Sequence, residues 1–300
     1  MVKGIKQSKG DLTFDIINHI LLLLVLIVCV YPLIFVVSAS ISDPAQVWSG
    51  NVWLFPKGIT FSGYKTIFEK DSIWIGYKNS LIYMVVGTLV NLFMTFTAAY
   101  PLSRKDFRAK GFLMGMYTVT MFFNGGLIPT YLLVKSLNLL DSIWAMILPN
   151  AVAFWNIVVT KTYFQTNIPD ELLEAASMDG CSNIKFLVRI VLPLSAPIIA
   201  VMALFYGVGH WNSYFNALIY LSSRDKYPLQ LFLREILLQN QIQSQMLETT
   251  SGAQALLEQQ KVAETIKYGV IIVSSLPMLI IYPFVQKHFV KGIMVGSIKG

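Results

Sequence analysis

A polar segment in the second half of the chain combines acidic and small residues at a spacing that suits protein docking rather than catalysis. Pro169 fits the first position of a short helix, and Asp170 complements the positive end of the helix dipole. Gly180 fits the left-handed position that ends such a helix. Ser182 then provides a cap for a second helix, which runs to Pro193. The spacing therefore predicts two short helices joined by a sharp bend.

The first of these short helices carries the residue types that we expect another protein to contact. Ala175 and Ala176 give it a face of small side chains, which permits close approach by a second surface. Glu174 and Asp179 add acidic groups to a loop in which basic residues normally gather. We interpret the segment as a rigid docking element.

Uncharged polar residues inside apolar stretches form a second group of candidates. They are costly in a membrane unless they face protein or water, so they mark either a solute path or ties between helices. Amides and aromatic faces suit sugars, because sugar hydroxyls need both donors and acceptors while CH faces stack on rings. Asn91 and Asn124 share this chemistry. The candidates for the path itself are Asn150, Trp155, Asn156, Trp211, Asn212, Tyr214 and Asn216.

Other reactive residues lack the partner residues that their chemistry needs. His210 has no acidic residue within any apolar stretch, so we interpret it as packing or as a hydrogen-bonded helix contact, not as a proton relay. Cys29 and Cys181 have no partner at disulfide or metal-site spacing. The three histidines show no HExxH or comparable pattern, and no GxxxxGKS/T phosphate loop occurs. We therefore expect no catalytic residue, metal or cofactor in this chain.

The composition places these candidates in a membrane. Of the 300 residues, 55% are hydrophobic and 13% are charged, whereas an ordinary soluble domain has about 25% charged residues. Lipid must therefore replace water over much of the surface. The formal charge of +7 does not indicate nucleic-acid binding, because no Lys/Arg cluster has interleaved aromatic residues.

Helices must position both groups of candidates, and the apolar stretches predict where these helices lie. A helix needs ~20 apolar residues to cross the hydrocarbon core. We predict an all-α integral membrane protein with one transmembrane domain over residues 1–300. Its six expected spans cover residues 17–38, 80–102, 112–134, 143–163, 194–218 and 268–285.

The distribution of Lys and Arg predicts the orientation of these spans. The compact cluster from Arg104 to Lys110 lies in a short loop, where the bias of basic residues toward the cytosol is strongest. Both termini and the docking segment, residues 164–193, are therefore expected to be cytosolic. Residues 41–78 and 222–267 are expected to be extracellular.

The two extracellular segments have distinct compositions. Residues 41–78 are rich in aromatic side chains of the kind found at the headgroup level. Residues 222–267 are rich in Gln and predict two helices, 229–245 and 253–266, with a break at Ser251-Gly252. This second segment is either an amphipathic hairpin lying on the bundle or a surface that receives an external partner.

The docking segment resembles a known pattern. Glu174-Ala175-Ala176, three residues, Gly180, nine residues and then Ile190-Val-Leu-Pro193 is similar to the coupling-loop signature of ABC importer permeases. Asn79-Ser80, Trp211-Asn212 and the C-terminal residues 289–300 resemble sugar permeases of the type of the second maltose permease subunit. Gly125-Gly-Leu-Ile-Pro-Thr130 and the long segment after the fifth span look more like the branch for complex oligosaccharides, including aldouronate-type systems.

The resemblance implies a fold, a mechanism and a set of partners. It implies the type I importer permease fold with six transmembrane helices in a bacterial cell membrane, and alternating access driven by a partner. The implied partners are a second permease subunit forming a heterodimer, a dimeric cytosolic ATPase that carries the ATP and Mg, and an extracellular solute-binding protein. The implied ATPase-coupling residues are Glu174, Ala175, Ala176, Asp179, Gly180, Leu192 and Pro193.

The sequence leaves three other interpretations open, and the first two predict features that differ from these. A secondary transporter or channel predicts charged residues within the spans or an inverted repeat. A membrane-embedded enzyme predicts clustered His, Asp and Glu at one membrane face. An ABC importer permease for a solute other than a sugar shares the coupling loop, and only the cargo distinguishes it.

Overall fold

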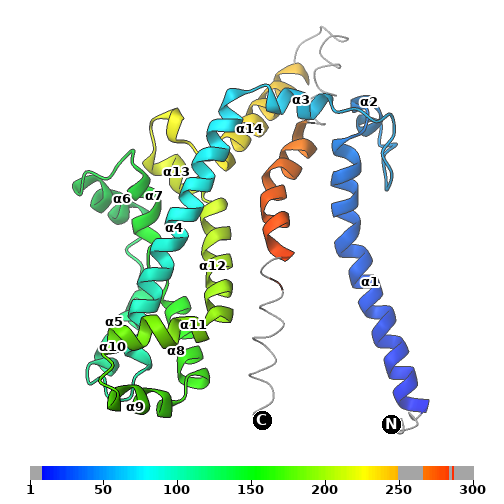
Figure 1. Cartoon of the computed structure of the whole chain (residues 1–300). Helices are drawn as coiled ribbons and strands as arrows, with labels where there is room; N and C mark the ends of the chain where they lie inside the picture. The colour runs from blue at the N-terminus through cyan, green and yellow to red at the C-terminus, as the bar shows by residue number, and fades with distance from the viewer. Residues whose placement is uncertain (1–8, 249–265, 284–285, 287–300) are drawn as a thin grey trace. The chain divides into compact units, whose positions relative to one another are not determined.

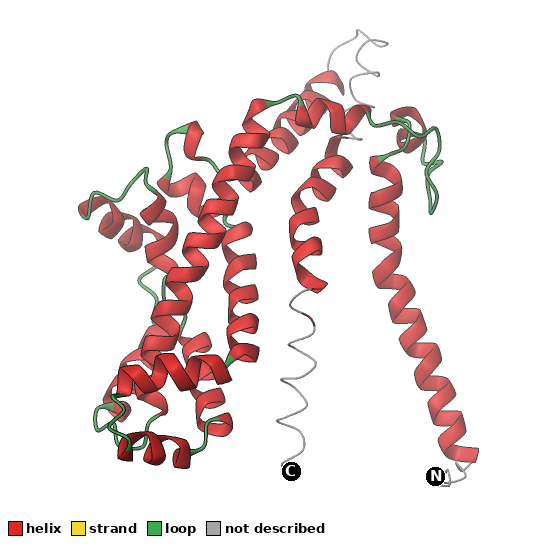
Figure 2. Cartoon of the chain, viewed as in Figure 1, coloured by secondary structure: helices red, strands yellow, loops and turns green. Residues whose placement is uncertain are grey.

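The structure, a computed structural model, is built from helices. It describes residues 9–248, 266–283 and 286, and within these ranges no strand occurs (Figure 2). The all-α class expected from the apolar stretches is confirmed.

The elements, shown in Figure 1, are α1 (Lys9–Ser40), α2 (Pro44–Trp48), α3 (Ser62–Phe68), α4 (Asp71–Ser103), α5 (Lys110–Phe122), α6 (Leu127–Ser136), α7 (Ile143–Ile147), the 3-10 turn η1 (Leu148–Asn150), α8 (Phe154–Asn167), α9 (Asp170–Met178), α10 (Asn183–Phe186), the π-helix η2 (Leu187–Val191), α11 (Leu192–Leu194), α12 (Ala196–Trp211), α13 (Tyr214–Tyr220), the 3-10 turn η3 (Arg224–Lys226), α14 (Leu229–Glu248) and a last helix, Ile266–Pro283.

The chain packs as two units. The first consists of residues 1–70 and 236–275, and the second of residues 71–235 and 276–300. In the first unit, α1 contributes a span of 31 residues with a mean hydropathy of 3.3, and none of that window is buried. A helix that is apolar on every side needs lipid or another protein around it.

The second unit is organised around α4. This long helix packs against α12, α8 and α7. The main hydrophobic cluster includes Phe96 from α4, Phe164 from α8 and Met202 from α12. A smaller cluster near the start of α4 joins Tyr83 to Met146 and to Leu231. The polar contacts described below lie between helices and loops of this second unit.

Three helices are long and apolar enough to cross a membrane, and the number rises to six if each of three bent helix pairs is one span. The expected span 112–134 corresponds to α5 and α6, which are bent by 116° at a break of four residues. Gly126 lies in this break with φ +84° and ψ −178°, a conformation that essentially only glycine adopts. The Asn124 side chain accepts a hydrogen bond from the Gly126 amide at 2.9 Å. Asn124 therefore shapes the bend.

The fifth expected span, 194–218, is likewise not one straight helix. Helix α12 begins at Ala196, follows the preceding helical segment at an angle of 83°, and ends at Trp211. The Ser213 hydroxyl and amide both donate to the His210 carbonyl, at 2.6 and 3.2 Å, and so satisfy a carbonyl at this helix end. Helix α13 then continues the chain.

Some expected features fall outside the described residues. These are the break at Ser251-Gly252, the second helix of the 222–267 segment apart from Ile266, the end of the sixth span at residues 284–285, and the C-terminal pattern at 289–300.

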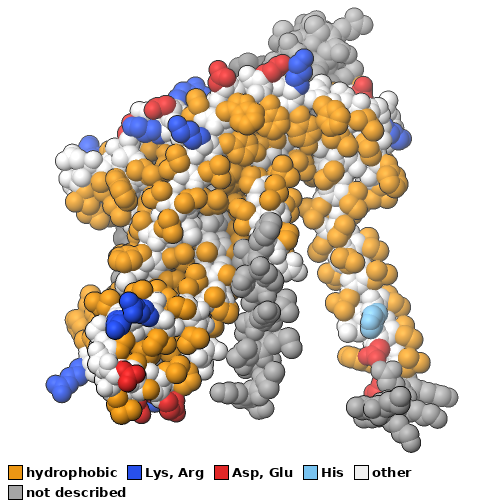
Figure 3. Space-filling view, in the orientation of Figure 1, with side chains coloured by type: hydrophobic (Ala, Val, Ile, Leu, Met, Phe, Trp, Pro, Cys, Tyr) orange, Lys and Arg blue, Asp and Glu red, His pale blue; other side chains and the backbone are white. Residues whose placement is uncertain are grey.

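The second unit has two polar ends. On the face that Figure 3 shows, charged side chains gather over α9 and α10 at one end and over the α13–η3 region at the other. Hydrophobic side chains cover much of the surface between these ends. We call the two ends the α9 end and the η3 end.

Candidate functional site

The docking segment folds as two short helices joined by a tight turn. Pro169 precedes α9 as its N-cap, with φ −61° and ψ 142°, and Asp170 and Glu171 occupy the first turn. Their carboxylates lie where the helix dipole favours negative charge. The sequence predicted this helix, although it placed Pro169 one position further inside.

Gly180 ends α9 with a left-handed φ of +69°. The Cys181 amide donates to the Ala176 carbonyl at 2.9 Å, and the Gly180 amide donates to the Ser177 carbonyl at 3.0 Å. These two bonds form the Schellman arrangement. A Cβ added at Gly180 meets nothing within 4 Å, so the backbone conformation and not a lack of space requires glycine here.

The chain then enters the second short helix. The Ser182 hydroxyl caps it by accepting from the Lys185 amide at 3.4 Å. Residues Leu187–Val191 form a π-helix directly before the turn that contains Leu192 and Pro193. Proline has no amide hydrogen to donate, and a π-turn is one way for a helix to absorb that loss.

The exposed face of α9 differs from the sequence-based expectation at one position. Glu174, Ala175 and Asp179 are exposed, whereas Ala176 is buried in the main hydrophobic cluster. The two alanines therefore do not form one shared small-residue face, because successive helical residues point about 100° apart. Ala176 fixes α9 to the bundle, and Met178, which is 84% exposed, takes a place on the outer surface.

A salt bridge that the sequence did not predict ties α9 to the loop after α4. Lys105 Nζ lies 2.6 Å from Asp170 Oδ2, and both side chains are exposed. This hydrogen bond raises the pKa of Lys105 and lowers the pKa of Asp170. Beside it, the Gln165 side chain donates to the Ser103 carbonyl at 3.3 Å. Exposed pairs of this kind contribute ~0–1 kcal/mol, so this bridge sets orientation more than stability.

Polar residues from several helices meet around a cavity of about 160 Å³ in the second unit. Its polar lining comes from Asn91, Asn150, Tyr206, His210, Ser213 and Asn216. Within the described residues, no hydrogen bond engages the side-chain amides of Asn150 and Asn216. These two amides are therefore free to bind a solute.

The inner wall of this polar cavity is held by a buried network. His210 Nε2 donates to Asn91 Oδ1 at 2.6 Å, and the Asn91 amide donates to the Asn150 carbonyl at 2.6 Å. The Thr95 and Tyr206 hydroxyls are also 2.6 Å apart. The interpretation of His210 as a hydrogen-bonded helix contact agrees with this geometry, and Asn91 also acts as a tie between helices.

Close packing at Gly87 makes this network possible. A Cβ at position 87 would lie 2.5 Å from Cε1 of the His210 ring, which no real structure tolerates without a shift. Sequence reasoning missed this glycine, since its partner is 123 positions away in the sequence. A glycine within an otherwise regular span is the signal that could have found it.

The other path candidates do not line the polar cavity. Trp211 is fully buried, with its ring centroid 6.1 Å from that of Tyr77. Asn212 donates to the Val208 carbonyl at 3.0 Å, and Tyr214 lies under the Arg234 guanidinium at 5.1 Å. Trp155 is 65% exposed and Asn156 is half-buried. The structure thus brings together Asn150 and Asn216 but not the aromatic candidates.

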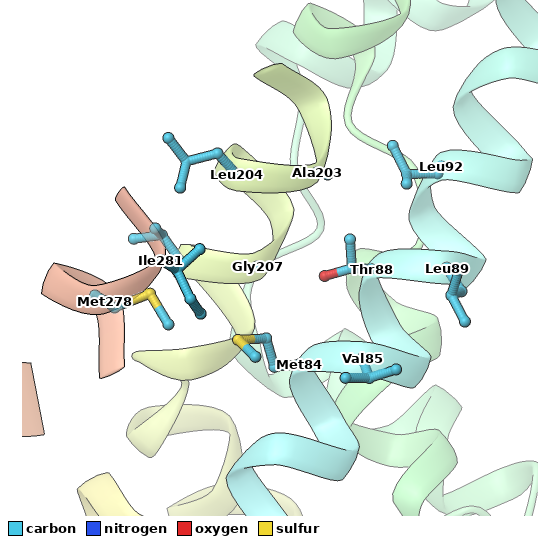
Figure 4. A pocket seen from close by; sticks show the side chains of 11 residues that line it. Met84, Val85, Thr88, Leu89, Leu92, Ala203, Leu204, Gly207, Met278 and Ile281 are labelled. Carbon is cyan, nitrogen blue, oxygen red and sulfur yellow. The ribbon is translucent and has the colours of Figure 1, made fainter. Parts of the chain in front are cut away.

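A larger cavity of about 320 Å³ in the same unit is unsuited to a sugar (Figure 4). Aliphatic side chains and Met residues line it between α4, α12 and the segment of Met278 and Ile281. Thr88 supplies the one hydroxyl among the described lining residues, and this hydroxyl has no hydrogen-bond partner there. Such a lining favours hydrocarbon, whereas the polar cavity offers donors and acceptors.

The η3 end is held by a dense set of hydrogen bonds. Asp141 accepts from the Ser222 and Ser223 amides at 3.0 Å each, from the Ser223 hydroxyl at 2.6 Å and from Lys226 Nζ at 2.7 Å. These donors hold the pKa of Asp141 well below its usual range. Asp141 adopts a left-handed φ of +54°, which aspartate tolerates better than most residues.

Helix α4 is anchored in the same region. The Asn79 amide donates to the Asp225 and Tyr227 carbonyls at 2.7 and 3.0 Å. The Tyr83 hydroxyl donates to the Lys226 carbonyl at 2.6 Å, and the Ser80 hydroxyl accepts from the backbone amide at position 229 at 2.8 Å.

Comparison with known proteins places this geometry in context. Residues 72–295 match the family model described as binding-protein-dependent transport system inner membrane component. Protein LplC of Bacillus subtilis (strain 168) is 40% identical over 98% of this chain and 97% of its own length. The polygalacturonan/rhamnogalacturonan transport system permease protein YtcP of the same organism is 42% identical over 96% of this chain and 98% of its own. Among solved structures, a chain of a bacterial ABC transporter involved in the import of the acidic polysaccharide alginate is similar, with a TM-score of 0.84 and 32% identity over 95% of this chain and 100% of that chain.

Proposed function

The chain belongs to the family of binding-protein-dependent transport system inner membrane components, and from this premise we propose that it carries an acidic oligosaccharide into the cell. It is a permease subunit of an ATP-binding-cassette importer of the carbohydrate-uptake type, with the type I all-α fold. It is a transport subunit and not an enzyme.

The polar cavity is the observation that carries the choice of cargo. None of the described residues that line it has a carboxylate, while Asn150 and Asn216 offer free amides. An acidic lining would repel a uronate, whereas amide N–H groups donate to its carboxylate and to its hydroxyls. Two similar proteins handle acidic polysaccharides, namely polygalacturonan or rhamnogalacturonan in one case and alginate in the other.

The size of this cavity supports a second permease chain. About 160 Å³ is small beside the ~300–1,000 Å³ of typical small-molecule sites. A path for an oligosaccharide therefore needs walls from a partner, which we assign to a different permease subunit in a heterodimer. The fully exposed apolar surface of α1 is consistent with such a partner or with lipid.

The α9 end is the proposed contact with a dimeric cytosolic ATPase. Glu174, Ala175 and Asp179 face outward from a helix that Gly180 ends rigidly, so this surface can transmit movement into the bundle. Ala176, which is buried, and Leu192, which packs against the main cluster, fix the two short helices to the core, and the exposed Pro193 lies in the turn that follows them. ATP and Mg belong to the partner.

The orientation follows from the same assignment. The α9 end lies in the cytosol with both termini, since Arg104, Lys105, Arg108 and Lys110 cluster beside it. The η3 end then faces outward, where an extracellular solute-binding protein delivers the cargo. We place the protein in a bacterial cell membrane as a multi-pass subunit.

Uptake by the assembled transporter in proteoliposomes tests the cargo. We expect ATP-dependent uptake of a labelled oligogalacturonate in preference to neutral maltotriose, and a loss of that preference in Asn216→Asp, which adds a like charge to the cavity. Asn212→Asp, four positions earlier at the end of α12 and outside the cavity, is the matched control. Uptake that persists without ATP and follows an ion gradient would instead indicate a secondary transporter, and equal uptake of both sugars would refute the acidic cargo.

Association with the ATPase tests the docking surface. We expect Glu174→Lys to abolish both copurification of the ATPase and uptake, because it reverses a charge on the outer face of α9. Glu69→Lys, at an exposed carboxylate outside this helix, is the control. Normal ATPase binding and uptake in Glu174→Lys would exclude this surface as the coupling site.

A further inference from the structure

A third cavity, which lies at the α9 end, has no role in the proposed transport path. It has a volume of about 410 Å³ and lies between the last turns of α4, the loop that follows and the start of α10. The polar part of its lining includes Arg104 and Tyr100, and the apolar part includes Phe107, Ile184 and Leu187. This mixed lining differs from both the apolar cavity of Figure 4 and the polar path cavity.

The polar part of this cavity has unused hydrogen-bonding capacity. The Arg104 side chain is only 17% exposed, and its one contact within the described residues runs from Nε to Asp106 at 3.3 Å. The Tyr100 side chain is buried and its hydroxyl has no hydrogen-bond partner there. A buried hydroxyl without a partner is costly, and the part-buried Arg104 guanidinium has N–H groups beyond the one that bonds Asp106, so the site favours a ligand that accepts hydrogen bonds.

The charge around the cavity identifies the sign of that ligand. Arg104 supplies the positive charge of the lining, while Asp106 is its acidic residue and already pairs with Arg104 through Nε. Lys105 is engaged by Asp170. An anion with several oxygens, such as a phosphate, matches the fork of N–H groups that Arg104 presents.

The apolar part of the cavity and its place in the chain identify the source of the phosphate. Ile184 is 77% exposed, and with Phe107 and Leu187 it forms an apolar wall that a free ion does not need. The cavity also lies at the end of α4, a 33-residue helix long enough to span a bilayer. Phosphate groups of lipids occupy this depth, next to acyl chains.

We propose that this cavity binds an anionic phospholipid, with Arg104 and Tyr100 donating to the headgroup phosphate and with Phe107, Ile184 and Leu187 lying along its acyl chains. The bound lipid braces α10, which directly follows the turn at Gly180. The proposal does not depend on the cargo or on the ATPase contact.

Lipid retention by the assembled transporter tests the proposal. The full complex is reconstituted into nanodiscs that contain equal amounts of phosphatidylglycerol and phosphatidylcholine, extracted into detergent, and analysed for bound lipid by mass spectrometry. We expect selective retention of phosphatidylglycerol, which Arg104→Gln lowers about tenfold because it removes a charge-assisted hydrogen bond. Arg108→Gln removes the same charge from an exposed position outside the cavity, and we expect it to retain lipid as the unchanged protein does.

A second variant keeps the test decisive if Arg104→Gln does not assemble. Tyr100→Phe preserves the ring and removes only the hydroxyl, so we expect about a threefold loss of phosphatidylglycerol. Equal retention of the two lipids, or the same loss in Arg108→Gln as in the cavity variants, would overturn the proposal. Displacement of the lipid by soluble glycerol phosphate at matched concentration would also overturn it, because the site would then recognise a free anion.

Discussion

The two ends of the second unit hold an aspartate–lysine pair each, and the two pairs differ in how completely the chain surrounds them. At the η3 end, Asp141 receives hydrogen bonds from two backbone amides and a hydroxyl as well as from Lys226. At the α9 end, Asp170 has Lys105 as its partner, and both side chains are exposed. The hydrogen bonds of the η3 end are thus completed by the chain itself, whereas the charged groups of the α9 end are exposed and accessible to other molecules. Substitutions at the η3 end should therefore change stability, and those at the α9 end should change partner binding.

The largest effect on stability should come from Asp141→Ala. We expect a loss of about 3 kcal/mol in the free energy of unfolding, because several donors and Lys226 lose their acceptor and alanine tolerates the left-handed backbone poorly. Thermal unfolding of the detergent-solubilised complex measures this. Asp141→Asn keeps one acceptor oxygen and the backbone preference, so it should lose clearly less. Equal losses in both variants would show that the charge alone holds the η3 end.

The next effect concerns Gly180, and it should appear in transport. Gly180→Val should lower uptake about tenfold, because a β-branched residue at φ +69° costs about 1–2 kcal/mol and shifts α9. Gly180→Asn, which tolerates this backbone better, should retain most of the uptake. Since no atom lies within 4 Å of an added Cβ, a clash cannot explain the difference. Similar uptake in both variants would mean that the turn is not a strict requirement.

A smaller effect tests the η3 end by pH. Because the pKa of Asp141 is lowered from 3.8 in the folded state, its contribution to stability is fully present above about pH 4 and is lost as the pH falls further. The stability difference between the unchanged protein and Asp141→Asn should therefore stay constant from pH 7 to about pH 4.5. A difference that already shrinks near pH 6 would contradict the lowered pKa.

The smallest effect should come from Asp170→Asn at the α9 end. Its salt bridge is exposed, so we expect no resolvable change in the free energy of unfolding. The same measurement as for Asp141→Asn makes the two variants a matched pair. A loss as large as at Asp141 would remove the contrast between the two ends.

The parts of the site that local spacing determines were predictable from the sequence. The α9 helix, the left-handed Gly180 and the Ser182 cap depend on residues within a few positions of one another, and all three occur. His210 as a helix contact followed from the absence of acidic partners, and Asn91 supplies the contact.

The parts that depend on distant residues were not predictable. Asp141 and Lys226 are 85 positions apart, so no spacing rule connects them. The burial of Ala176 depends on which side of α9 meets the bundle, and both sides of that helix carry small or apolar residues. The 116° bend between α5 and α6 had a local signal in Gly126, but apolar composition alone suggested one straight span.

The π-helix Leu187–Val191 changes the rotation of the docking segment about the helix axis. A π-turn holds one more residue than an α-turn, so residues on its two sides are rotated by about 100° relative to an uninterrupted α-helix. Phe186, before the turn, and Val191, at its end, both face the main cluster in this arrangement. Without the extra residue, one of them would point away from the core and the α9–α10 pair would present a different side to its surroundings. The π-turn therefore sets the rotation of the short helices and determines which face of the α9 end is exposed.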